Sequence, residues 1–367
     1  MQGANRSDSH GGRGFAARQT PGTADGRSAA IRADLPGIIK RCPSIPLPMI
    51  EPTLNYVLCP GPAATGVSSG NASVAESRHR MAYWEWNATG NPAHPHVVLC
   101  VHGLSRQGRD FDTLARALSA HARVICPDVV GRGQSDWLAD PMGYQIPQYA
   151  ADMLALVAQL QGQGPIATLD WVGTSMGGLI GMGVAGQPGL PLPVPVRRLV
   201  LNDVGPVIQW EALQRIGLYL GQLARFESLQ QAADAMWAIS TSFGPHTPQQ
   251  WLELSRHMVR TLPEGGITLH YDPAIAVPFR ALTQESAAAG EAMLWQLYDH
   301  IAARTLLLRG AQSDLLSRET AQAMAQRGPR ARLVEFEGVG HAPTLVAADQ
   351  VAAVTGFLLA AEGALAG

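Results

Sequence analysis

Short, mostly apolar runs recur along the chain after residue 80, and turn-forming stretches separate them. Runs of this length without polar alternation are typical of strands buried on both faces of a parallel sheet. Between the runs lie segments with apolar residues at helical spacing, such as 111–120 and 149–160. The expected strands cover residues 81–87, 97–101, 123–126, 166–172, 197–201, 305–308 and 332–336. This alternation predicts an α/β fold with a mostly parallel central sheet and helices on both faces.

The alternation of strands and helices stops between residues 205 and 303. Four helices are expected there, over residues 209–223, 228–239, 248–262 and 291–303. The stretch holds a large share of the aromatic side chains, most of which ordinary helix packing would explain. We therefore expect a helical cap at 205–303, inserted after the sixth strand into a core formed by 78–204 and 304–367.

The first 77 residues differ from the rest of the chain. They are rich in Gly, Ser, Arg and Pro and have no hydrophobic period. Their one apolar stretch, residues 35–50, is interrupted by Lys40, Arg41 and prolines, unlike the core of a signal peptide. We expect residues 1–77 to be a disordered segment, or the result of a translation start placed too early, with Met49 or Met81 as the true start.

Composition excludes several classes of function. The net charge of −2 is too balanced to favour nucleic acid or an anionic membrane surface. No run of roughly 18 uncharged apolar residues occurs, so no membrane span is expected. The four cysteines form neither a disulfide framework nor a zinc pattern, which favours a reducing compartment. Without an export signal, the expectation is a cytoplasmic protein.

One stretch carries candidate chemistry, the sequence Gly-Thr-Ser-Met-Gly at residues 173–177. It joins the strand 166–172 to a small-residue segment that fits a tightly packed helix. A serine at the apex of so sharp a turn has a strained backbone and very close neighbours, and Gly173 and Gly177 lack the Cβ atoms that would clash there. The turn presents the Ser175 hydroxyl and the Met176 N–H on the same side, which supplies a nucleophile and one donor for an oxyanion.

A serine nucleophile needs a base and an acid that orients the base. His341 follows the strand 332–336 and lies on a loop at the carboxyl edge of the sheet, so it is the candidate base. Asp314, on the loop after the strand 305–308, is the preferred acid. Asp203, directly after the strand 197–201, is the alternative.

The order Ser, Asp, His along the chain resembles that of the α/β-hydrolase superfamily. His102-Gly103 after one strand, and Asp128 through Asp136 after the next, extend the resemblance to residues 81–359. The resemblance implies the α/β-hydrolase fold with a cap. It also implies that the backbone N–H of Leu104 is the second oxyanion donor and that His102 is structural.

These residues predict a serine carboxylesterase that acts through an acyl-enzyme on small to medium esters, with Ser105 and Trp210 as candidate pocket residues. Branches with the same triad remain alternatives: C–C bond (meta-cleavage product) hydrolases, enol-lactonases, polyester or hydroxyacid-oligomer hydrolases, acyl transferases and perhydrolases. A non-catalytic binding protein is disfavoured because all three triad residues are present. No metal-binding or dinucleotide-binding motif occurs, so we expect a small-molecule ester substrate and no cofactor or metal.

Overall fold

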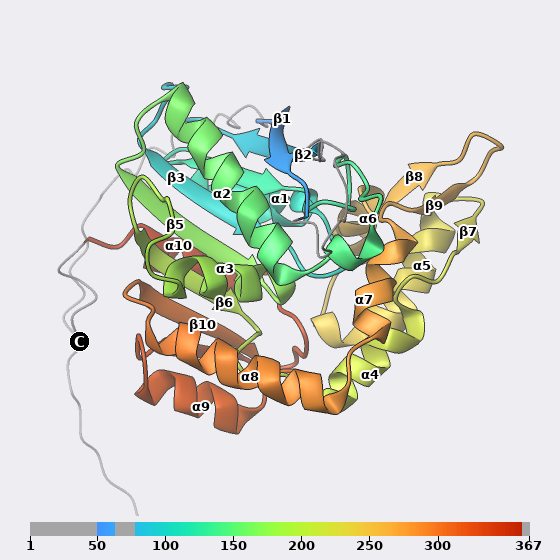
Figure 1. Ribbon diagram of the computed structural model, residues 1–367. Coiled ribbons are helices and arrows are strands. Elements are labelled where there is room, and N and C mark those ends of the chain that lie inside the picture. Colours follow the sequence, from blue (N-terminus) through green and yellow to red (C-terminus); the bar gives the residue numbers. More distant parts are fainter. Residues whose placement is uncertain (1–49, 63–77, 362–367) are drawn as a thin grey trace, which may run out of the picture. The chain divides into compact units, whose positions relative to one another are not determined.

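The computed structural model describes residues 50–62 and 78–361. All of them belong to the second of two units into which the chain divides, residues 49–367. Eight strands form one sheet: β1 (Thr53–Pro60), β2 (Arg78–Trp86), β3 (His96–Val101), β4 (Arg123–Pro127), β5 (Thr168–Thr174), β6 (Val196–Asn202), β10 (Arg304–Gly310) and β11 (Arg332–Phe336). Their order in the sheet is β1-β2-β4-β3-β5-β6-β10-β11 (Figure 1). Strand β2 is antiparallel to both of its neighbours, and the strands from β4 to β11 are parallel.

Helices cover both faces of this sheet, as the sequence predicts. One face carries α1 (Asp112–Leu118) and α10 (Ala348–Leu358), and the other carries α2 (Ile146–Gln163), α3 (Met176–Gly186), α8 (Gln284–Asp299) and α9 (Arg318–Gln326). Successive side chains of a strand point to opposite faces. In β3, Val97 and Leu99 pack into the core under α2 and α3, whereas Val98 and Cys100 pack into the core under α1 and α10.

The sheet begins earlier in the chain than the hydrophobic pattern predicts. Strand β1 pairs with β2 along its whole length, from Thr53 opposite Glu85 to Pro60 opposite Arg78. As an edge strand it buries only one face: Val57 and Cys59 face the core, and alternate residues are exposed. This alternation of buried and exposed residues, which lies between two prolines, is a weaker sequence signal for a strand than the continuous apolar runs of the central strands. The rest of the N-terminal segment, residues 1–49 and 63–77, lies outside the described residues.

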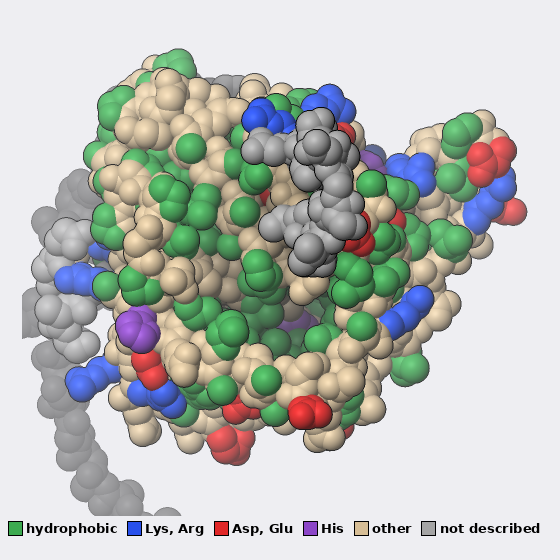
Figure 2. Space-filling model, viewed as in Figure 1, with side chains coloured by type: hydrophobic (Ala, Val, Ile, Leu, Met, Phe, Trp, Pro, Cys, Tyr) green, Lys and Arg blue, Asp and Glu red, His purple; other side chains and the backbone are tan. Residues whose placement is uncertain are grey.

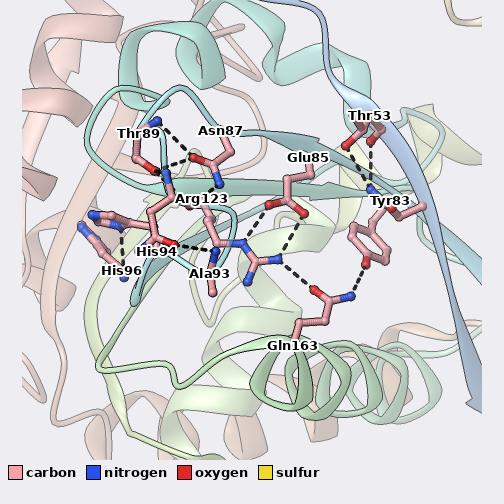
Figure 3. Close-up of polar contacts among 12 residues, drawn as sticks. Thr53, Tyr83, Glu85, Asn87, Thr89, Ala93, His94, His96, Arg123 and Gln163 are labelled. Carbon is pink, nitrogen blue, oxygen red and sulfur yellow. Dashed lines mark hydrogen bonds and ion pairs between the residues drawn. The ribbon is translucent and has the colours of Figure 1, made fainter.

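A buried arginine ties together the end of the sheet that lies away from the carboxyl ends of the parallel strands. Arg123, the first residue of β4, donates to Glu85 at 2.8 Å and to Gln163 at 2.8 Å (Figure 3). Gln163 in turn donates to Tyr83 Oη at 3.3 Å. These bonds connect β4 with β2 and with the end of α2. The ion pair with Glu85 compensates the positive charge of the buried Arg123.

The cap is a mixed structure. It contains α4 (Trp210–Tyr219), α5 (Leu229–Ser240), α6 (Pro248–Arg256), α7 (Ala276–Arg280) and a small sheet of β7 (Arg225–Phe226), β8 (Val259–Thr261) and β9 (Ile267–Leu269). Its core is built by Phe226, Met236, Trp251 and their neighbours. Strands of two or three residues show no period in a sequence, which is why the sequence predicts helices alone. Acidic and basic side chains gather at the tip of the β8–β9 hairpin (Figure 2).

The last helix expected in the cap belongs to the sheet instead. Helix α8 packs along α3 so closely that a Cβ on Gly186 would collide with the backbone of Leu297. Trp295 and Tyr298 of α8 pack against the core below the sheet. The residues between α7 and α8 therefore mark the return from cap to core. Among the described residues, no helix is both long and apolar enough to cross a membrane.

Candidate active site

The turn between β5 and α3 has the geometry that its glycines predict. Ser175 has φ 51° and ψ −117°, a conformation strained for a residue with a side chain. A Cβ on Gly173 would collide with Gly177 O, and a Cβ on Gly177 would collide with Val101 O. Only glycine at both positions allows β3, β5 and α3 to approach this closely.

The structure brings His341 to Ser175. His341 Nε2 lies 3.0 Å from Ser175 Oγ, and His341 Nδ1 lies 2.7 Å from Asp203 Oδ2. A carboxylate only accepts hydrogen bonds, so the Nδ1–H donates to Asp203 and the bare Nε2 accepts the hydrogen of the Ser175 hydroxyl. The imidazole is thereby held in the tautomer that a general base requires.

This geometry corrects the preferred acid. Asp314 does not contact His341; its carboxylate pairs with Arg215 at 2.7 Å, and its side chain is 48% exposed. Asp203 is fully buried at the end of β6, the strand next to β5, whereas Asp314 follows β10, one strand further away. The loop after β10 turns the neighbouring Ser313 inward, and Ser313 Oγ donates to Asp203 Oδ2 at 2.6 Å.

The backbone groups expected to bind an oxyanion lie beside the serine. Met176 is the first residue of α3, where the N–H has no partner within the helix. Among the described residues, the Leu104 N–H also has no acceptor. A Cβ on Gly103 would lie 3.6 Å from Ser175 Cβ, so the turn that carries Leu104 is adjacent to the nucleophile.

His102 supports this turn. Its Nε2 accepts from Val129 N–H at 2.9 Å, so its Nδ1–H donates to Gly103 O at 2.7 Å. Burial lowers the pKa of His102 to about 3, and the ring is neutral at neutral pH. The arrangement agrees with the structural role that the resemblance implies.

A cleft between the cap and the carboxyl edge of the sheet opens over Ser175. Apolar side chains of the cap, including Met236, Phe243 and Leu254, line one wall, and polar side chains of the loop after β3 line the other. Ser105 is among the lining residues. Trp210 is not; it is half-buried at the start of α4.

A sequence model of the α/β-hydrolase family matches residues 98–354. The chain belongs to this family. The match covers both sides of the cap and includes the serine turn and the His341 loop, which agrees with the resemblance seen in the sequence.

Relatives of this hydrolase carry several names. A 3-hydroxybutyrate-oligomer hydrolase of Cupriavidus necator is 49% identical over 316 residues, which cover 85% of this chain and 99% of that protein. A pimeloyl-[acyl-carrier protein] methyl ester esterase of Xanthomonas campestris is 28% identical over 265 residues, which cover 71% of this chain and 93% of that protein. The crystal structure of an α/β hydrolase from Novosphingobium aromaticivorans superposes with a TM-score of 0.68 at 36% identity, covering 84% of this chain and 98% of its own.

Two further residues that the sequence analysis did not single out hold the hydrolase site together. Asn202 Nδ2 donates to Thr174 Oγ1 at 2.9 Å and to Pro343 O at 2.8 Å, which joins the serine strand to the His341 loop. Ser242 of the cap accepts from Gly340 N–H and donates to His341 O. Of the two, only Asn202 has a signal in the sequence, which is its position at the end of a strand, at the edge of the sheet where the predicted site lies.

One group of potential metal ligands occurs among the described residues, and it lies outside the cleft. Cys59, His79 and Asp152 are buried between β1, β2 and α2, with ligand atoms within 4.8 Å of one another. His79 Nε2 and Asp152 Oδ2 are already hydrogen-bonded at 3.0 Å, and Gln148 donates to the other carboxylate oxygen. Three donors are one fewer than a structural zinc site uses, so the group is best described as a hydrogen-bonded network.

Proposed function

We propose that this hydrolase cleaves the ester bonds of short 3-hydroxybutyrate oligomers with Ser175 as nucleophile, His341 as general base and acid, and Asp203 as the orienting acid. The observation that carries the chemistry is the continuous hydrogen-bond chain from Asp203 through His341 to Ser175. The substrate is supported by the 49% identity to an oligomer hydrolase along 99% of that protein. Hydroxyacid-oligomer hydrolysis is one of the alternatives that the sequence leaves open.

The proposed reaction has two halves. Ser175 Oγ attacks the ester carbonyl carbon while His341 Nε2 accepts its proton; the bond to the leaving oxygen then breaks, and His341 returns the proton to that oxygen. Water, deprotonated by His341, next attacks the carbonyl carbon of the acyl-serine; the bond to Ser175 Oγ then breaks, His341 returns the proton to Ser175 Oγ, and the acid is released. The N–H groups of Leu104 and Met176 bind the oxyanion of each tetrahedral intermediate, and each such donor is worth about 3–4 kcal/mol in the transition state.

The cleft suits an oligomer that is apolar along its length and charged at one end. Each 3-hydroxybutyrate unit presents a methyl group and an ester, which match the apolar cap wall. The terminal carboxylate needs a cation, and Arg106 and Arg215 both line the cleft. Arg106 is next to the nucleophile: its Cγ lies 3.7 Å from where a Cβ would sit on Gly103, close to Ser175.

Arg106 keeps donors for a second anion. Its Nε and Nη2 form a forked pair with Asp110 at 2.5 and 2.8 Å. Guanidinium has five N–H groups, so Nη1 remains available for a substrate carboxylate. Burial raises the pKa of Asp110, and the pairing with Arg106 opposes this.

The test is hydrolysis of synthetic 3-hydroxybutyrate dimer and trimer, with the released monomer measured by chromatography. We expect turnover by the wild type, none by Ser175→Ala, and normal turnover by Ser119→Ala, a buried serine at the end of α1. Turnover of p-nitrophenyl esters but not of the oligomers would leave a general carboxylesterase. Labelling by a fluorophosphonate without any ester turnover would favour the C–C hydrolase or lactonase branch. Activity that survives Ser175→Ala would contradict the triad.

A further inference from the structure

One arginine lies completely buried behind the two groups proposed to bind the oxyanion. Arg132, in the loop after β4, is 0% exposed. Its Nε donates to Leu104 O at 2.8 Å, and its Nη2 lies 3.6 Å from Met176 Sδ. A single rigid guanidinium therefore contacts both residues whose N–H groups are proposed to bind the oxyanion.

The charge of this guanidinium has no direct counter-ion. Its Nη1 donates to Val130 O at 2.7 Å and to Tyr149 Oη at 3.0 Å. Among the residues that the structure describes, no carboxylate lies within ion-pair distance of Arg132. The carboxylate of Asp272 instead accepts from Tyr144 Oη at 2.6 Å, and the centre of the Tyr144 ring lies 5.7 Å from the guanidinium carbon.

An unpaired buried charge is costly, and a role limited to hydrogen bonding would not require it. Neutral donors could satisfy the carbonyls of Leu104 and Val130 equally well. The positive charge acts on its surroundings: the pKa of His102, lowered mainly by burial, is lowered further by Arg132. A negative charge that forms at the same site would experience the opposite effect and be stabilised.

We propose that Arg132 is a positioning residue of the oxyanion hole, which fixes Leu104 and Met176 and places a buried positive charge behind the developing oxyanion. The proposal rests on the acyl-enzyme mechanism of the proposed function, but not on the identity of the substrate. In a water-excluded site a charge interacts with the intermediate far more strongly than it would in solvent. The oxyanion thus supplies, for the lifetime of the intermediate, the counter-charge that the resting protein lacks.

The test compares Arg132→Gln, Arg132→Lys and a matched control, Arg198→Gln. Arg198 is also fully buried, but it donates to the carbonyls of Leu358 and Ala360 at the end of α10. The measurements are kcat and KM for p-nitrophenyl acetate per active site, and the inhibition constant of phenylboronic acid, whose adduct with a serine is tetrahedral and anionic. Near-ultraviolet circular dichroism verifies that each variant is folded.

We expect Arg132→Gln to lower kcat and weaken phenylboronic acid binding together, by about tenfold or more, with KM little changed. Arg132→Lys keeps the charge but not the fork, so its losses are smaller and follow the same proportion. If Arg132→Gln does not fold, the Lys variant decides. A folded Arg132 variant with wild-type kcat and boronate affinity overturns the proposal, as does an equal loss in Arg198→Gln. Activity that survives Ser175→Ala would instead remove the mechanism on which the proposal rests.

Discussion

Asp203 is a fully buried carboxylate, and both of its oxygens accept hydrogen bonds. Its Oδ1 accepts from Gly310 N–H at 2.8 Å, and its Oδ2 accepts from Ser313 Oγ and from His341 Nδ1. These donors fix the position of the carboxylate beside His341. An imidazolium that forms during proton transfer would therefore meet a charge that is already in place and needs no reorganisation.

The two candidate acids can be separated by matched substitutions. Asp203→Asn preserves the side-chain volume but places a neutral amide opposite His341 Nδ1. The imidazole is then no longer held in the tautomer with Nδ1 protonated, and it has no negative partner. We expect kcat for p-nitrophenyl acetate to fall by about 10³–10⁴-fold. Asp314→Asn breaks a pair with Arg215 at the exposed rim, and we expect kcat to be nearly unchanged. The opposite ranking would restore Asp314 as the acid.

Arg106 offers a test of how the substrate is oriented. If its guanidinium binds the terminal carboxylate, Arg106→Gln should raise KM for the 3-hydroxybutyrate trimer acid by about tenfold. KM for the trimer methyl ester, which lacks that charge, should not change. Steady-state kinetics on the two substrates give the comparison within one variant.

Because Arg106→Gln leaves Asp110 unpaired, the double variant Arg106→Gln/Asp110→Asn serves as the control. It removes both members of the pair and adds no net charge to the cleft. We expect the same selective loss for the acid. Equal KM changes for acid and ester would show that Arg106 shapes the cleft but does not bind the terminal carboxylate of the substrate.

At the scale of residues, the serine turn and the histidine loop could be predicted because each is a local pattern at the end of a strand. The carboxylate that contacts His341 could not, since the choice depends on which side chain of the loop after β10 turns inward. Ser313 and Asp314 are neighbours, yet Ser313 faces Asp203 and Asp314 faces Arg215. Strand order contains the missing information, because β6 lies next to β5. Arg132 lies in the stretch Asp128 through Asp136 that contributes to the resemblance, but its burial could not be predicted because it depends on tertiary packing.

At the scale of elements, strands buried on both faces were predictable from their continuous apolar runs, whereas β1 and the short cap strands were not. Their stability comes from partners distant in sequence: β1 from β2, and β9 from β7 and β8. The placement of α8 was hidden for the same reason. Its amphipathic pattern predicts a helix but does not indicate that α3 is the surface it covers.

The contact between α3 and α8 can be tested with two glycines of the same helix. A Cβ on Gly186 would collide with the backbone of Leu297, whereas a Cβ on Gly183 would have no atom within 4 Å. We expect Gly186→Ala to lower the free energy of unfolding by about 1–3 kcal/mol, because α8 must move away. Gly183→Ala should raise it by about 0.5–1 kcal/mol through helix propensity. Urea denaturation measures both, and equal effects would mean that α8 does not pack here.

At the scale of the whole molecule, cap and core are joined around the site. The loop after β4 forms a bridge from Arg132 to Tyr271, and Gly133 N–H donates to His270 O. In another part of the cap, Ser242 Oγ donates a hydrogen bond to His341 O and so holds the His341 loop. On the face drawn in Figure 2, charged side chains of both signs are scattered over the core. A charged substrate would therefore be recognised by residues of the cleft rather than attracted by the electrostatic field of that face.

Burial of neutral histidines makes the stability of the whole molecule depend on pH. Burial lowers the pKa of His102 to about 3, and it also lowers the pKa of His246, His257 and His270 in the cap. The unfolded chain binds protons at these groups below about pH 6.5, whereas the folded chain does not. Their contribution to stability is complete above pH 6.5 and is lost as the pH falls toward the folded pKa. Asp128 acts in the opposite direction, because burial raises its pKa to about 6.

A single substitution isolates the largest of these contributions. His102 alone should cost about 2 kcal/mol of unfolding free energy between pH 7 and pH 5. In His102→Gln, whose amide oxygen can still accept from Val129 N–H, that part of the pH dependence should disappear, while the opposing effect of Asp128 remains. Urea midpoints at the two pH values give the difference, with His121→Gln, an exposed histidine, as the control. The same loss between pH 7 and pH 5 in both variants would mean that His102 is protonated in the folded protein, and the structural role of its neutral ring behind Gly103 would then have to be abandoned.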